Sequence, residues 1–297
     1  MNSKAIRKQL LAAVAMVLVA AVALGSSTYA WFVASGTVTA TGMKVQAKSE
    51  GGLAISHGGT AWGTSADGNA GTTASKLNPA STKDFTLWST ATALDPSKKD
   101  ADQTTRKAVT LTQDDNGNTT TDNGYVLARQ FLIRSSNPSM LAKGLTVKSI
   151  TVDSNKTGAD GKPVFTMSTA LRVGLAFSNL PGTTTSKTMI VAPVTVTTNT
   201  QGDKANQPTT SYKFYKDASD TTGADVTLTT IGDSGAEVVA SDVTIPNGTS
   251  SAIQVVVYVW IEGEDNNLYS DNFHVEDLSV TVEFESKDFS GTAVVSP

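Results

Sequence analysis

A chain of 297 residues without a single cysteine is long enough for one large domain, and it excludes disulfide bonds and thiolate chemistry. Charged residues make up only 17% of the chain, and the formal net charge of −4 argues against nucleic acid as a partner. Threonine, serine, glycine, asparagine and valine are plentiful, which favours strands joined by turns over helices. We therefore expect an all-β protein.

Residues 1–30 have the layout of a secretory signal peptide. Three basic residues precede an apolar stretch, Leu10 to Leu24, that is shorter than the ~20 residues of a membrane-spanning helix. Thr28 and Ala30 place small side chains at −3 and −1, which predicts cleavage by signal peptidase between Ala30 and Trp31. A secreted chain that begins there loses three positive charges and no acid, so its formal charge is −7.

Two alternatives compete with this cleavage. An uncleaved N-terminal anchor would extend the apolar segment through Tyr29, Trp31 and Phe32, as aromatic residues often lie at a membrane interface. A type IV prepilin would need the apolar helix to continue past a cleavage site after a glycine. The present sequence instead turns polar and β-like soon after Gly25. The cleaved signal peptide is the interpretation we favour.

An alternation of apolar and polar residues begins at Val38 and predicts strands. Val38 and Ala40 alternate with threonines, and the apolar positions from Met43 to Ala47 alternate with polar residues. The two sets are out of phase across Thr41–Gly42. Because a one-residue slip moves every side chain to the other face of a sheet, the slip marks either a bulge or the boundary between two strands.

We expect one β-sandwich domain over residues 43–297, preceded by an N-terminal arm or donor strand over residues 31–42. Within the domain, the polar residues 57–124 are interpreted as a loop-rich insertion of extended surface loops that has room for one short helix or strand pair. The expected strands are Leu53–Ile55, Tyr125–Ile133, Leu145–Val152, Leu171–Phe177, 189–196 with a proline that suits an edge or a bulge, Ile253–Ile261 as a buried central strand, and Val280–Phe284. Many short strands with long loops favour a jelly-roll-like sandwich.

The most concentrated acidic group near a predicted strand lies in the segment IEGEDNN at 261–267. On a continuous strand, Glu262 and Glu264 project to one face. Together with Asp265 they are candidates for a calcium site or for the paired carboxylates of glycoside chemistry. A solvated turn after a buried strand is the interpretation we favour. We therefore expect no metal site and no cofactor, with calcium as the one candidate ion.

Other catalytic patterns are weak. The acidic segment 112–124 has neither the glycine nor the closing glutamate of an EF-hand loop, so we interpret it as a turn cluster. His57 and His274 stand apart, whereas a zinc hydrolase needs three ligands. No phosphate-binding loop, nucleophile elbow or dinucleotide fingerprint is present. We expect no catalytic residues and a protein that is not an enzyme.

Four aromatic residues support an alternative function, because aromatic rings stack on sugars. A secreted, monomeric carbohydrate-binding module of lectin type would use Trp62, Trp88, Trp260 and Tyr269. Trp260 follows the apolar run VVVYV, so it is more simply a core residue.

Three segments together resemble the TasA/camelysin family of exported Gram-positive proteins. They are GSSTYAWF at 25–32, TGMKVQA at 41–47 and DLSVTVEFES at 277–286. ALRVGLAF at 170–177 and VYVWIEGED at 257–265 are similar to segments of longer clostridial members. The resemblance covers the first and the last fifty residues, and the middle of the chain matches only in strand pattern.

The resemblance implies a SipW-type signal peptide and a jelly-roll subunit of extracellular or biofilm-matrix fibres at the cell surface. It implies self-association into filaments, a minor fibre-anchoring protein as partner, and an N-terminal strand that pairs into a neighbouring subunit. The implied subunit interface holds Trp31, Phe32, Val33, Val38 and Ala40. The alternative is an arm that folds back on its own sheet. The metallopeptidase activity described for camelysins is not carried over, because the chain has no zinc motif.

Overall fold

The computed structural model describes residues 37–41, 44–48, 52–68, 77–91, 106–114, 117–119, 124–139, 141–154, 170–193, 210–265 and 278–287. Among these residues no helix is long and apolar enough to cross a membrane. The predicted cleavage site between Ala30 and Trp31 lies outside the described residues, as do Phe32 and Val33 of the expected interface.

The described residues are mostly strands, which confirms the all-β prediction. Their bounds are β1 Thr37–Thr41, β2 Lys44–Lys48, β3 Leu53–Ser56, β4 Ser65–Asp67, β5 Pro79–Thr82, β6 Trp88–Thr90, β7 Lys107–Val109, β8 Val126–Ser135, β9 Lys143–Ser154, β10 Leu171–Ser178, β11 Lys187–Val191, β12 Ser211–Phe214, β13 Ala224–Thr227, β14 Ala236–Thr244, β15 Ile253–Glu262 and β16 Leu278–Glu285.

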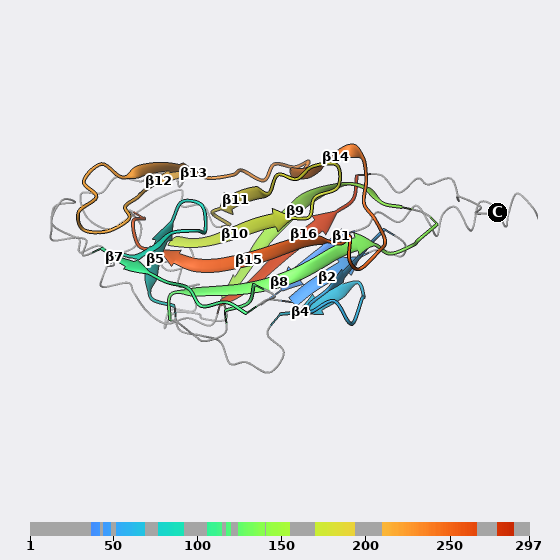
Figure 1. Cartoon of the computed structure of the whole chain (residues 1–297), viewed down its shortest axis with the longest axis horizontal. Helices are drawn as coiled ribbons and strands as arrows, with labels where there is room; N and C mark the ends of the chain where they lie inside the picture. The colour runs from blue at the N-terminus through green and yellow to red at the C-terminus, as the bar shows by residue number, and fades with distance from the viewer. Residues whose placement is uncertain are drawn as a thin grey trace, which may run out of the picture.

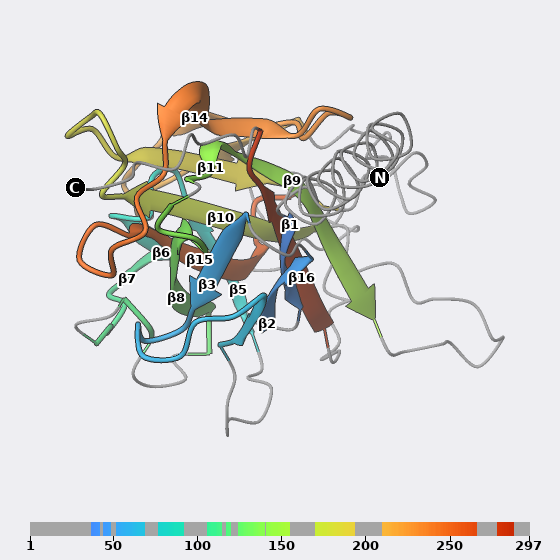
Figure 2. The ribbon, with the colours of Figure 1, turned by 90° about the vertical axis from the view of Figure 1, so that its right-hand side faces the viewer.

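Two large sheets lie face to face (Figures 1 and 2). The first, sheet A, has the strand order β14-β9-β16-β1-β2-β4. The second, sheet B, has the order β11-β10-β15-β5-β6-β7, and β8 joins it by pairing with both β15 and β3. Strand β15 is the centre of sheet B, because β10 flanks one side while β8 and then β5 flank the other. The β15–β5 pair is parallel.

The main core lies between sheets A and B. Val280, Val282 and Phe284 of β16 belong to the same buried cluster as the odd-numbered residues of β10 and β15. The rings of Phe177 and Phe284 meet edge to face across this core, with their centroids 6.2 Å apart. The expected core face of the last strand is therefore confirmed, with Val282 and Phe284 fully buried.

A second core covers the opposite face of sheet B at one end. It contains Tyr258 and Trp260 of β15, Val126 and Ala128 of β8, and residues of the two-stranded hairpin β12–β13. We call residues 211–227, which form this hairpin, the cap hairpin. Because β15 is buried on both faces here, its sequence is a continuous apolar run rather than a clean alternation. The central-strand prediction for Ile253–Ile261 is confirmed.

The polar segment 57–124 contributes more strands than the sequence predicts. Strands β4, β5, β6 and β7 all fall inside it, and β5, β6 and β7 extend sheet B. Strand β5 is fully buried although its sequence is only PAST. Short runs of small and polar residues carry no apolar alternation, so pairing with β15 determines this strand rather than local pattern.

Thr37–Thr41 folds back onto its own sheet in this single chain. Strand β1 pairs with β2 on one side and with β16 on the other. The two strands on either side of the slip at Thr41–Gly42 thus pair antiparallel: Val38 lies opposite Ala47, and Ala40 lies opposite Val45. Positions directly opposite each other share a face of the sheet, so the two out-of-phase sets need only one core.

Candidate functional site

The acidic end of β15 lies in a buried cluster of charged side chains. Glu262 is the last residue of β15 and is fully buried, and Asp265 is 3% exposed. The side chain of Glu264 is 7% exposed. The favoured interpretation of a solvated strand end is therefore wrong. The reason is tertiary: β5 pairs alongside the end of β15, and Tyr212 of the cap hairpin packs beside Glu262.

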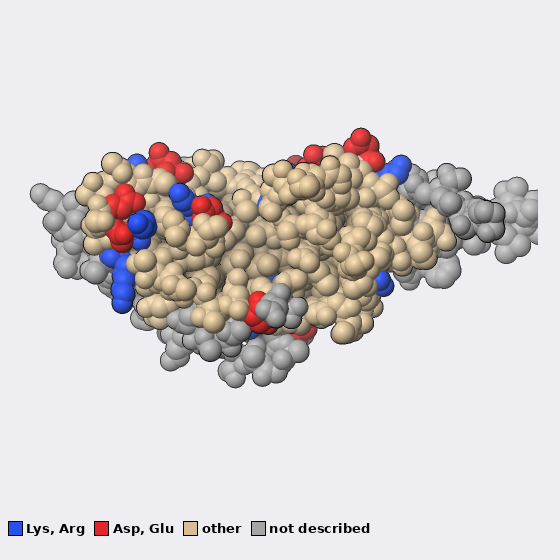
Figure 3. All heavy atoms as spheres, viewed as in Figure 1, with Lys and Arg blue, Asp and Glu red and all other residues tan. Residues whose placement is uncertain are grey.

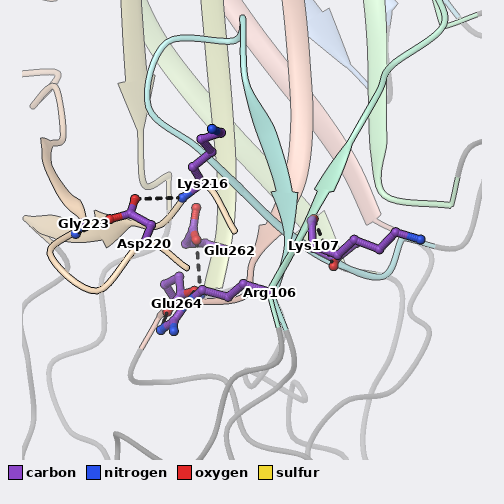
Figure 4. Close-up of polar contacts among 8 residues, drawn as sticks. Arg106, Lys107, Lys216, Asp220, Gly223, Glu262 and Glu264 are labelled. Atoms are coloured by element: carbon purple, nitrogen blue, oxygen red, sulfur yellow. Dashed lines mark hydrogen bonds and ion pairs between the residues drawn. The ribbon is translucent and has the colours of Figure 1, made fainter. Parts of the chain in front are cut away.

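Glu264 is held by Arg106 (Figure 4), and this arginine also contacts the cap hairpin. The guanidinium of Arg106 donates from Nε to Oε1 of Glu264 at 2.7 Å and from Nη2 to Oε2 at 3.0 Å. The same guanidinium lies 3.8 Å above the ring centroid of Tyr215, which follows β12. This two-point geometry is the strong form of an arginine–carboxylate pair.

Asp265 and Glu262 have different kinds of partner. Arg172 of β10 donates from Nη2 to Oδ2 of Asp265, and both side chains are buried. Glu262 accepts hydrogen bonds from the indole Nε1 of Trp260 at 3.0 Å and from the backbone amide of Glu264 at 3.2 Å. Both donors are neutral, and no arginine in the described part of the chain forms an ion pair with Glu262. We call these six residues, Arg106, Arg172, Tyr212, Glu262, Glu264 and Asp265, the charged cluster.

Glu262 holds a proton at neutral pH. Burial raises the pKa of its carboxyl group to about 8, against the opposing effects of the Trp260 hydrogen bond and the nearby charge of Arg172. Burial also raises the pKa of the Tyr212 phenol well above its usual value, and the neighbouring Glu262 acts in the same direction. Both groups are therefore neutral in the folded protein at pH 7.

The cluster does not have the form of a calcium site. Calcium binds roughly six to eight oxygen ligands. In this cluster, carboxylate oxygens of Glu264 and Asp265 instead accept hydrogen bonds from Arg106 and Arg172. Within the described part of the chain, no group of three or more possible metal ligands is found. Asp114, a member of the predicted turn cluster, accepts hydrogen bonds from the backbone and side chain of Asn118, as a turn would require.

The aromatic residues expected for a sugar-binding face divide into two groups. Trp88 is 4% exposed and Trp260 is fully buried, so both belong to the second core. Trp62 is half-buried, and the guanidinium of Arg134 lies 4.0 Å above its ring. Tyr269 lies outside the described residues. Trp88 is thus unsuited to binding a sugar, and Trp260 is the core residue that its apolar neighbours predict.

Phe85 is an aromatic residue whose role the sequence does not indicate. It has a positive φ of 66°, which is rare for a bulky residue, and its ring stacks on Tyr258 at 4.7 Å. Its backbone amide donates to Thr82 Oγ1 at 3.1 Å, and its carbonyl accepts from Trp88 Nε1 at 3.1 Å. These contacts hold the strained loop so that the ring fills the space above Gly174.

The Phe85 ring leaves no room for a side chain at position 174, and a substitution there should lower the stability of the protein. In Gly174→Ala, the new Cβ would lie 2.3 Å from Phe85 Cε1, so we expect the free energy of unfolding to fall by ~1–3 kcal/mol. Phe85→Ala in the same chain removes the clash, so the double variant should lose less than the sum of the two single losses. Urea unfolding measures all three. Gly232→Ala is the control, because its new Cβ meets open space. If the double variant loses as much stability as the two single variants added together, Phe85 does not pack on Gly174.

The expected interface positions Val38 and Ala40 lie in the middle of sheet A. Val38 is opposite Phe284, and Ala40 is opposite Val282. These partners on β16 are fully buried core residues. Strand β1 therefore occupies a slot between β16 and β2.

Sequence reasoning missed Arg106, Arg172, Tyr212 and Phe85. One signal was present for Arg172: a lone charge in the apolar segment LRVGLAF, on the face opposite Leu171 and Val173, indicates a buried partner. Arg106 is 158 residues from Glu264, so no local pattern joins them.

A scan against protein-family models and searches of the curated proteins and of the solved structures found no match to this chain.

Proposed function

We propose that this protein is a secreted structural subunit that assembles into extracellular or biofilm-matrix fibres by exchanging β1 between subunits. Export would follow cleavage between Ala30 and Trp31, and a minor anchoring protein would join the fibre to the cell surface. The proposal includes the jelly-roll class for the two packed sheets. The observation that supports it is the position of β1, the first described strand, between β16 and β2.

Exchange conserves the backbone pairs of sheet A. Strand β1 is paired at four positions with β16 and at five with β2. The β1 strand of a neighbouring copy has the same sequence, so it can form the same pairs in the same slot. Each subunit then gives one strand and accepts another. Because this contact is head to tail and need not close, it produces an open filament.

The outer strands of the sheets favour exchange over simple edge pairing. The β14–β9 pair has two register shifts, and the Lys187 ammonium donates to the carbonyl of Glu237 on β14. Strands β4 and β7 are only three residues long. On β11, the carbonyl of Ile190 accepts from the amide of Thr229 at 2.7 Å. Bulges, lysines and short strands are the features that discourage edge-to-edge association.

A disulfide placed between β1 and β16 tests the exchange. Thr37 lies opposite Glu285, and opposed positions in antiparallel strands are about 4.5–5.5 Å apart, within disulfide range. The chain has no cysteine, so Thr37→Cys/Glu285→Cys introduces the only pair. After oxidation of assembled fibres, we expect a ladder of covalently linked subunits on a denaturing gel, because each bond joins two chains.

A second cysteine pair provides the matched control. Thr151 and Thr281 are opposed on β9 and β16, which belong to the same subunit in either arrangement. Thr151→Cys/Thr281→Cys should therefore give linked monomers only. If Thr37→Cys/Glu285→Cys also gives monomers only, from fibres seen by negative-stain microscopy, β1 is not exchanged. If neither protein forms fibres, the proposed function itself is wrong.

A further inference from the structure

We propose that the cap hairpin is a proton-controlled flap, which closes over sheet B when the charged cluster takes up one proton and opens when that proton is lost. This property is independent of fibre assembly. The proposal rests on two observations. The charged cluster beneath the hairpin has more carboxyl groups than guanidinium groups, and few contacts attach the hairpin to sheet B.

The cluster contains one carboxyl group more than it has guanidinium groups. Glu264 is paired with Arg106, and Asp265 is paired with Arg172. The third acid, Glu262, faces the indole of Trp260 and the amide of Glu264 from its own strand and turn, Ser81 from β5, Arg172 from β10 and Tyr212 from β12. Among these described neighbours Arg172 is the one cation, and it is paired with Asp265. A proton on Glu262 therefore makes the ionised acids of the charged cluster equal in number to its guanidinium groups.

The cap hairpin depends on this buried region for its stability. It consists of two strands with four paired positions, and an isolated two-stranded hairpin is marginal in water. Tyr212 donates its hydroxyl hydrogen to the carbonyl of Thr82, and Tyr215 lies under the guanidinium of Arg106. Phe214 and Val226 pack into the second core.

Surface charges remain on the cap hairpin in either state. Figure 3 shows Lys, Arg, Asp and Glu side chains gathered at the end of the molecule that carries the hairpin and β5 to β7. In its turn, hydrogen bonds from Ser219 hold the pKa of Asp217 below its usual value, and those from the Gly223 and Lys216 amides do the same for Asp220. These two acids stay ionised above pH 5, so they add no pH dependence to closure.

The direction of the pH effect follows from proton uptake on closure. With the flap open, Glu262 meets water and its pKa returns towards 4.5; with the flap closed, the pKa is about 8. The closed state therefore binds more protons. Closure is strongest below about pH 4.5, weakens by about tenfold for each pH unit above that, and levels off above about pH 8.

Hydrogen exchange of the purified secreted protein measures this equilibrium. Amide protection factors for residues 211–227, corrected for the intrinsic pH dependence of exchange, are compared with those of β10 and β15 between pH 5 and pH 9.5. In the wild type we expect the hairpin's protection to fall about tenfold per pH unit up to about pH 8 and then to level off. The protection of β10 and β15 should change much less.

Two conservative variants separate this effect from a general loss of charge. Glu262→Gln keeps the size and remains neutral, so its hairpin protection should stay flat with pH. Glu237→Gln removes an exposed carboxylate on β14 and should behave as the wild type. The same pH slope in Glu262→Gln overturns the proposal. So does a wild-type hairpin whose protection is constant from pH 5 to pH 9.5, a result that needs no variant to fold.

Discussion

Arg172→Met is expected to lower the free energy of unfolding by ~3–5 kcal/mol, because it leaves the buried carboxylate of Asp265 without its cation. Arg172 is fully buried and Asp265 nearly so, which means that water cannot replace the lost partner. Guanidinium chloride unfolding at pH 6 measures the loss. At that pH Glu262 is protonated in the folded state, since burial raises its pKa to about 8.

A double variant distinguishes an unpaired charge from a packing defect. Arg172→Met/Asp265→Leu removes both charges, so it should recover most of the stability that the single variant loses. The exposed pair of Lys213 and Asp225 provides the control, because Lys213→Met should cost less than ~1 kcal/mol. If the double variant is no more stable than Arg172→Met, the ion pair is not the cause of the loss.

Deleting residues 31–41 is expected to abolish fibres and to destabilise the subunit. Removing β1 takes away both of its ladders and opens the slot between β16 and β2. At ~0.5–1.5 kcal/mol net per hydrogen bond, several lost bonds correspond to a stability loss of ~3–5 kcal/mol. Negative-stain microscopy and urea unfolding of protein beginning at Gly42 measure the two effects. Fibres of normal appearance would contradict a role for β1 in assembly.

A peptide added to the truncated protein tests whether the slot accepts a strand from outside. A peptide of residues 31–42 should bind and restore the unfolding midpoint towards that of the intact chain, because it supplies the missing pairs. In the control peptide, Val38→Thr and Ala40→Thr keep the length and the β-propensity but change the positions opposite Phe284 and Val282. We expect weaker stabilisation from it; equal stabilisation would show that the slot does not select its occupant.

Strands with a strong local pattern were predictable from the sequence. The alternation of Leu171, Val173, Leu175 and Phe177 predicts both a strand and its buried face, and β10 has that face in the main core. The strand expected at 189–196 is present as the edge strand β11, but it begins at Lys187 and ends at Val191, before the proline at position 193. Such strands can be predicted because a strand with one face in the core alternates apolar and polar residues at consecutive positions.

For the candidate site, the sequence indicated the position of the acidic residues but not their partners. The segment at 261–267 drew attention because it gathers three acids, yet whether they bind an ion, water or arginine depends on chain from elsewhere. Arg172 is 93 residues from Asp265, and Arg106 is 158 residues from Glu264. The buried strand β5, with its sequence PAST, likewise has no local signal.

The sequence by itself determined that this protein is built of strands, which faces of β10 and β16 are buried, and where its N-terminal pattern breaks. Only the tertiary structure decided that β1 and β2, on either side of this break, pair antiparallel in one sheet, and that two of the three acids pair with arginines while Glu262 does not. The reason is physical. Burial periodicity is local to a strand, whereas register, ion pairing and desolvation arise between residues that the chain brings together only when it folds.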